Sequence, residues 1–147
     1  MKKKLILTLM ASLLTIAATA QVSRRNFHAY LYNNEYKVYL RVNLYEQNIQ
    51  VPGQELYGEL PGYLGKQQSS FCWVITSCQI TGEREATLQL INDFGSEDLR
   101  ATLTCLNDST YTLRQVEGSP IKVPNNGKWQ KLPKTLELRR KIGVSGN

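Results

Sequence analysis

The sequence predicts an all-β fold, specifically a small antiparallel meander barrel, with a sandwich of two sheets as the alternative. Three observations lead to this prediction. Residues 36–45 alternate polar and apolar side chains, which is the period of a strand with one buried face. No apolar stripe with helical spacing follows residue 20. Short polar turns separate the successive apolar segments, as an antiparallel meander requires.

The first 20 residues have the pattern of a cleavable export signal. Three lysines precede the apolar run 5–18, and Ala18-Thr19-Ala20 offers the small residues that signal peptidase cuts after. The run is shorter than the roughly 20 residues that span a bilayer, so no stable membrane anchor is expected. The first cysteine is Cys72, which excludes a lipoprotein. We therefore expect a signal peptide at 1–20 and one β-barrel domain at 21–147, periplasmic or secreted.

Composition and charge narrow the function classes. With 41% hydrophobic and 20% charged residues, the 147-residue chain has the composition of a globular protein. Three of the 18 basic residues lie in the leader, which leaves 15 against 12 acidic residues and lowers the net charge from +6 to +3. The basic surplus lies at the C-terminus, where residues 122–141 hold seven Lys or Arg and one Glu. For an exported protein, a solvated basic face is the simplest interpretation, and nucleic acid is not expected as a partner.

The expected strands can be paired on paper, because residues opposite one another share a face of the sheet. A three-residue loop at 107–109 sets Cys105 against Tyr111 and Leu103 against Leu113. A loop at 82–84 sets Cys78 against Leu88 and Thr76 against Leu90. Strands are expected at residues 27–32, 36–45, 71–81, 85–92, 99–106, 110–117, 121–123 and 135–141.

This register divides the side chains into two faces. The apolar face becomes the predicted core, and it consists of Cys72, Val74, Cys78, Ile80, Leu88, Leu90, Leu99, Ala101, Leu103, Cys105, Tyr111 and Leu113. Phe71, Trp73 and Ile75 fall on the other, mostly polar face, with Ile75 opposite Ile91. They form either an exposed contact patch or a surface that other strands cover.

The segment 51–65 is predicted to be an irregular loop. Its four glycines and two prolines favour turns, while Tyr57, Leu60 and Tyr63 are among its large apolar groups. The loop is either a binding element or a lid that closes one end of the barrel. Seven of the eight tyrosines lie at residues 30–63, and tyrosine suits contact with protein or sugar.

No complete catalytic, metal or cofactor motif is present, and we expect a protein that is not an enzyme. His28 is the only histidine, so a site with several histidines is excluded within one chain. The acidic run 92–98 lacks the spacing of an EF-hand loop and fits a hairpin turn. Three cysteines permit one disulfide, but Cys72 and Cys78 lie too far apart on one strand. Buried free thiols are expected, although sheet packing could bring Cys105 to either partner.

Two short segments carry a resemblance to known proteins. The leader ending Ala18-Thr19-Ala20-Gln21, together with residues 126–136, resembles small exported β-barrel proteins of anaerobic gut and oral bacteria, most of unknown function. The segment Ile142-Gly143-Val144-Ser145 is similar to the Ile-Gly-Thr run that staphostatin-like inhibitors of cysteine proteases present, with valine in place of threonine. The resemblance implies a barrel of the lipocalin or staphostatin kind and an inhibitory role.

The sequence thus predicts an exported, non-enzymatic module that binds a protein, with inhibition of a secreted protease as its specific form. A lipocalin-like carrier of a small hydrophobic ligand, and a glycan-binding or structural envelope protein, are the alternatives. No cofactor or metal is expected. The candidate partner-binding residues are Tyr57, Leu60, Tyr63, Phe71, Trp73, Ile75, Ile142 and Gly143.

Overall fold

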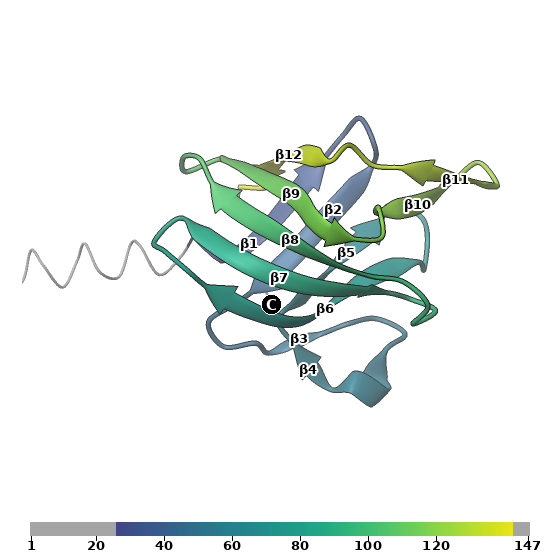
Figure 1. Cartoon of the computed structure of the whole chain (residues 1–147), viewed down its shortest axis with the longest axis horizontal. Coiled ribbons are helices and arrows are strands. Elements are labelled where there is room, and N and C mark those ends of the chain that lie inside the picture. The colour runs from purple at the N-terminus through teal and green to yellow at the C-terminus, as the bar shows by residue number, and fades with distance from the viewer. Residues whose placement is uncertain (1–25, 143–147) are drawn as a thin grey trace, which may run out of the picture.

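The chain folds into a closed antiparallel barrel of eight strands, seen in Figure 1, a computed structural model that describes residues 26–142. The predicted meander barrel is therefore confirmed. The barrel strands are β1 (His28–Asn33), β2 (Val38–Asn43), β5 (Gly62–Lys66), β6 (Cys72–Ile80), β7 (Glu85–Asn92), β8 (Asp98–Cys105), β9 (Thr110–Gly118) and β12 (Thr135–Arg140). Within the described residues, no helix is long and apolar enough to cross a membrane.

The barrel strands follow the order β1-β12-β9-β8-β7-β6-β5-β2, so neighbours along the chain are neighbours in the barrel. The last strand returns to the first through the pairs Leu31–Arg140 and Tyr32–Arg139, which removes the sheet edges. Two connections carry hairpins of their own. The first joins β3 (Ile49–Gln50) to β4 (Glu59–Leu60) through a 3-10 turn at Glu55–Tyr57, and the second joins β10 (Lys122–Asn125) to β11 (Lys128–Lys131).

The interior is filled by the apolar side chains that alternate along the barrel strands. Trp73, Tyr111 and Phe27 are its largest members, and each is at most 1% exposed. The indole N–H of Trp73 donates to the carbonyl of Lys122 (2.9 Å), and the Tyr111 hydroxyl donates to the carbonyl of Asn26 (2.6 Å). Both polar groups of this core are therefore satisfied, as buried polar groups must be.

The hairpin registers predicted from the sequence are confirmed where the pairing is regular. Cys105 pairs with Tyr111 and Leu103 with Leu113, and on the other hairpin Cys78 pairs with Leu88. These pairs turn most of the predicted core face inward. The residues from Leu88 to Leu113 on that face are all buried.

The prediction for the first half of β6 was wrong, because the strand contains a β-bulge at Thr76. Ile75 pairs with Leu90 and Ser77 with Gln89, so Thr76 is an extra residue without a partner position. One extra residue reverses the faces of every side chain before it. Trp73 and Ile75 therefore point into the barrel with 1% and 0% exposure, and Ile75 does not face Ile91. Cys72 and Val74 lie on the outer face instead.

The segment predicted to be an irregular loop at 51–65 contains a barrel strand, β5, which closes the gap between β2 and β6. The glycines of β5 obscure its strand pattern in the sequence. The rest of the segment is no lid on the barrel end. Ile49 and Val51 pack with Tyr63, Cys72 and Val74 on the outer wall, where they form a second, smaller core.

Candidate functional site

The small outer core holds residues 49–60, which we call the β3–β4 segment, against β5 and β6 (Figure 1). Ile49 and Val51 are buried in this contact, and Leu60 is half-buried beside them. Residues 52–59, which are exposed except for the half-buried Gln54, therefore start and end at fixed positions on the barrel wall. Because both of its ends are held, the segment loses little conformational entropy when its exposed side chains make a contact.

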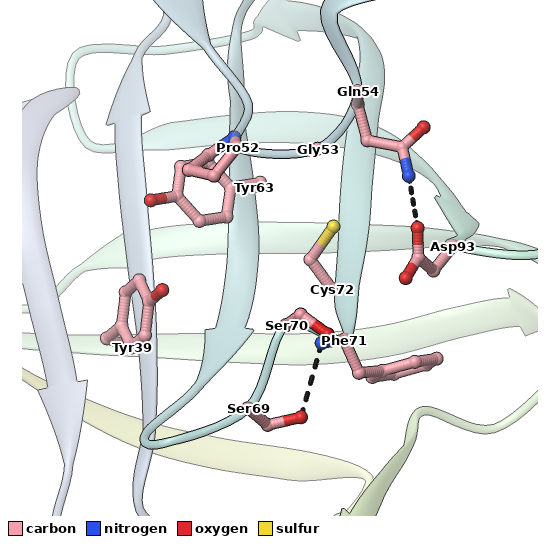
Figure 2. Close-up of a pocket in the computed structure, with 10 residues that line it drawn as sticks. All are labelled: Tyr39, Pro52, Gly53, Gln54, Tyr63, Ser69, Ser70, Phe71, Cys72 and Asp93. Carbon is pink, nitrogen blue, oxygen red and sulfur yellow. Dashed lines mark hydrogen bonds between the residues drawn. The ribbon is translucent and has the colours of Figure 1, made fainter.

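Between the β3–β4 segment and the wall lies a hollow of about 330 Å³, shown in Figure 2. It is lined by Tyr39, Pro52, Gly53, Gln54, Tyr63, Ser69, Ser70, Phe71, Cys72 and Asp93. The Gln54 amide donates a hydrogen bond to the Asp93 carboxylate, which ties the segment to the β7–β8 turn. Three connections of the barrel that lie apart in the sequence thus border the hollow. They are the β3–β4 segment, the connection between β5 and β6, and the β7–β8 turn.

Tyrosine rings form the side of the hollow over β2 and β5. The rings of Tyr39 and Tyr63 meet edge to face at 5.8 Å, and Tyr30 stacks on Tyr39 at 5.5 Å. Burial and the neighbouring Tyr63 raise the pKa of Tyr39 well above its usual value. The Tyr39 phenol therefore stays neutral at physiological pH, and this side of the hollow offers ring faces and hydroxyl groups to a ligand.

The Cys72 thiol lies at the base of the hollow (Figure 2). Burial, with a further effect of the Asp93 charge, raises the pKa of Cys72 to about 11. Because the thiolate is the nucleophile, this thiol is unreactive at neutral pH. Cys72, Cys78 and Cys105 are all free thiols.

Phe71 connects the hollow to a group of three aromatic side chains, Phe71, Phe94 and Trp129, which we call the trio. The ring centroid of Phe71 lies 5.1 Å from that of Trp129 and 6.0 Å from that of Phe94. The centroids of Phe94 and Trp129 lie 6.4 Å apart. Phe71 is only 8% exposed, whereas Phe94 is 71% and Trp129 56% exposed. In the trio, Phe94 and Trp129 are therefore exposed to solvent, and both pack on the buried ring of Phe71.

The turns that carry the trio are held by hydrogen bonds. The Asn92 side-chain oxygen accepts from the backbone N–H groups of Ser96 (2.9 Å) and Glu97 (3.2 Å), which fixes the turn that contains Phe94. A salt bridge of 3.7 Å between Lys122 and Glu97 joins that turn to the β10–β11 hairpin. Both exposed rings are thus carried by elements that hydrogen bonds and a salt bridge hold together.

The 3-10 turn Glu55–Tyr57 forms the outermost point of the β3–β4 segment, and we call it the tip. Leu56 is fully exposed and Tyr57 half-exposed, with no residue of the tip buried. Gly53 and Gly58 flank it with φ angles of +78° and +69°, values that favour glycine. The tip is a convex apolar projection with an acidic residue, Glu55, in it.

The structure brings together only part of the predicted site. Tyr63 and Phe71 line the hollow, Leu60 of the β3–β4 segment packs against the small outer core, and Tyr57 lies on the tip. Trp73 and Ile75 are buried in the barrel and are not available to a partner, which corrects their predicted exposure.

The predicted C-terminal residue Ile142 does not line this hollow. Ile142 is exposed and lines a different hollow of about 470 Å³ with Tyr30, Tyr32, Arg140 and Lys141. Gly143 lies outside the described residues. The hollow of Ile142 adjoins the tyrosine side of the first hollow, because Tyr30 lines it and stacks on Tyr39.

Sequence reasoning missed Phe94 and Trp129. Both stand in or beside polar turns, in Asn92-Asp93-Phe94-Gly95 and Asn126-Gly127-Lys128-Trp129. A large aromatic residue at a turn has few neighbours to bury it, and this signal could have identified both.

Among residues 26–142, no group of three or more His, Cys, Asp or Glu residues is placed to hold a metal ion. Comparisons of the chain with protein-family models, curated proteins and solved structures find no match.

Proposed function

We propose that the protein is an exported, non-enzymatic module that captures a partner protein on the surface formed by the tip, the hollow and the trio. One observation carries this proposal. Four of the eight large exposed hydrophobic side chains of the described chain, Leu56, Tyr57, Phe94 and Trp129, lie on the tip and the trio, two elements that the Gln54–Asp93 hydrogen bond links at the hollow. Tryptophan and tyrosine at the centre of a contact supply much of the affinity in protein interfaces.

The charge around the trio narrows the kind of partner. Residues 122–134 contain four lysines and no acidic residue, and Lys128 and Lys131 flank Trp129 on the exposed hairpin. The turn that carries Phe94 adds Asp93, Glu97 and Asp98, and Glu97 pairs with Lys122, so the surface holds charges of both signs. A partner with an apolar anchor and charged side chains of both signs around it complements this surface. The lysines would mainly raise the rate of association, and the aromatic rings would slow dissociation.

Inhibition of a secreted protease is the specific form of the proposal. A protease cleft accepts a convex, braced segment, and the tip offers Leu56 and Tyr57 in that form. The hydrophobic-ligand carrier is less well supported, because Trp73, Tyr111, Phe27 and the core leucines fill the barrel interior. Glycan binding is also less well supported. The trio rings stand at 45° to 81° to one another and offer no common flat platform for a sugar.

The experiment compares baits that differ only on this surface. Tagged wild-type protein is used to capture partners from the native secretome. A second bait carries Phe94→Ala and Trp129→Ala, and a control bait carries Leu106→Ala, a large apolar residue that is also exposed but lies at the other end of β8. We expect a partner at near-equal stoichiometry that the control retains and the trio variant loses. In calorimetry, the purified partner should then bind the wild-type and Leu106→Ala proteins and should not bind the trio variant. Equal capture by all three baits, or capture of lipid or glycan alone, contradicts the proposal.

A further inference from the structure

We infer that the turn between β8 and β9 is a glycosylation site, with the sugar attached to the side-chain nitrogen of Asn107. The inference goes beyond partner capture and rests only on export, which is a part of the proposed function. Three observations on Asn107-Asp108-Ser109 lead to it. They are the residue pattern, the exposure of the turn and the hydrogen bonds of the Asn107 side chain.

The residue pattern is that of an acceptor for N-linked sugars. Enzymes that attach sugars to asparagine recognise Asn-X-Ser or Asn-X-Thr, where X is any residue except proline. Of the ten asparagines in the chain, only Asn107 stands in this pattern, with Asp108 in the middle position and Ser109 in the third. Such a pattern can be used in an exported protein where it lies on the surface.

The turn meets this condition. Residues 106–109 are all exposed, and the apolar side chain of Leu106 is 51% exposed. A glycan on the next residue would shield this side chain. The turn lies at the end of β8 that is remote from the β7–β8 turn, which carries Phe94. A sugar on Asn107 would therefore leave the trio open to a partner.

The hydrogen bonds of Asn107 use the oxygen of its side chain. Asn107 Oδ1 accepts from the backbone N–H groups of Ser109 (3.0 Å) and Thr110 (3.0 Å) and from the Ser109 hydroxyl (3.1 Å). The amide nitrogen lies on the other side of the group and so points away from these donors. Donors on the oxygen also draw electron density from the nitrogen, which makes an amide proton easier to remove.

The transfer uses a sugar activated by a phosphate link to a lipid or a nucleotide. The bond between sugar C1 and the phosphate oxygen breaks, and the phosphate leaves with the electron pair. The bond between C1 and Asn107 Nδ2 forms, and a base of the transferring enzyme takes one amide proton. The Ser109 hydroxyl keeps its proton and holds the amide, so this serine is needed although it receives no sugar.

Mass spectrometry of the protein from the native secretome tests the inference. Trypsin releases residues 101–114 as one peptide, because Arg100 precedes it and Arg114 ends it. We expect this peptide to carry the mass of one or more sugars. A peptide N-glycosidase should remove that mass and convert Asn107 to aspartate. The tryptic peptide 123–128 is the control, because its two asparagines are exposed but lie outside the pattern.

Variants made in the native cells test the acceptor pattern. Asn107→Gln and Ser109→Ala should each abolish the modification, and Ser109→Thr should retain it. Ser109→Ala leaves both backbone hydrogen bonds to Asn107 Oδ1 in place, so a loss of sugar in this variant does not come from loss of the turn. Equal urea midpoints of the Ser109→Ala and Ser109→Thr proteins, measured after removal of any sugar, check that both fold alike.

An unmodified peptide in the secreted wild-type protein overturns the inference and leaves the proposed partner capture standing. A sugar that persists in Asn107→Gln, or that β-elimination releases and the glycosidase does not, belongs to Ser109 and overturns Asn107 as the acceptor. If the protein stays inside the cell, export is wrong and the inference falls with it.

Discussion

The ring of Tyr39 lies directly on the backbone of Gly65 in the neighbouring strand. A Cβ atom added at Gly65 would come within 2.3 Å of Tyr39 Cζ. The Tyr39 ring has little freedom to move, because it is stacked on Tyr30 and meets Tyr63 on the other side. The glycine therefore allows the tyrosine that borders the hollow to lie flat on the barrel wall.

Gly65→Ala should consequently lower the free energy of unfolding by about 1–3 kcal/mol, the usual cost of overpacking. Denaturant unfolding measures this loss. In a Tyr39→Ala background the same substitution should cost much less, since the ring that it meets is gone. An equal cost in both backgrounds would show that the contact is not the cause.

Tyr111→Phe should destabilise the barrel by about 1–3 kcal/mol, because it removes a buried hydroxyl that has two partners. The hydroxyl donates to the Asn26 carbonyl at 2.6 Å and accepts from the Arg140 guanidinium at 2.5 Å. The loss is measured as a shift of the urea midpoint. Tyr57→Phe on the exposed tip is the matched control, and a midpoint equal to that of the control would contradict the assignment.

Stability should fall as the pH rises from about 9 to 11, in part because of Cys72. Burial raises the pKa of this thiol from 9.0 to about 11, so in this range the unfolded chain releases a proton that the folded chain retains. Ionisation therefore favours the unfolded state. The thiol's contribution is fully present below pH 9.0 and is lost as the pH rises through about 11.

Cys72→Ala should flatten this decline, by up to about 2 kcal/mol between the two ends of the range. Unfolding followed by circular dichroism at each pH gives the slope for the two proteins. Tyr111 contributes in the same direction, because burial raises its pKa to about 12, so some decline should remain in the variant. Identical slopes in variant and wild type would exclude Cys72 as a source.

Gln54→Ala should speed the labelling of Cys72 by a thiol reagent severalfold. The Gln54 amide is the hydrogen-bonding link between the β3–β4 segment and Asp93, and the thiol lies beneath that segment. The measurement uses a chain in which Cys78 and Cys105 are alanine. Gln50→Ala, exposed on β3 of the same segment, is the control. If both variants label at the same rate, the hydrogen bond does not hold the hollow closed.

The barrel could be predicted from the sequence because most of its strands alternate polar and apolar side chains without interruption. From Leu88 to Leu113, every predicted core residue is buried. The face of β6 could not be predicted. The bulge at Thr76 has no signature in a run of nine residues in which both faces are partly apolar. Because of this one extra residue, Trp73 and Ile75 lie in the core and not on the surface where they were predicted.

The site was harder to predict than the fold, because it forms where separate turns meet. Tyr57 and Tyr63 were identified as large apolar groups in a segment rich in glycine and proline, and Phe71 as part of an apolar patch on the mostly polar face of the sheet. Their relation to Phe94 and Trp129 depends on which connections share an end of the barrel. That relation follows from the closed strand order and not from any local pattern.

The pairing of the first and last barrel strands leaves the two ends of the domain beside each other. The Lys141 N–H donates to the Tyr30 carbonyl at 2.9 Å, and the pair Leu31–Arg140 belongs to the same seam. A short linker between the two ends would therefore give a circular chain without distorting the barrel. Circular permutation with new termini in the exposed turn 82–84 should preserve the barrel, and tags or fused domains could then be attached far from the trio.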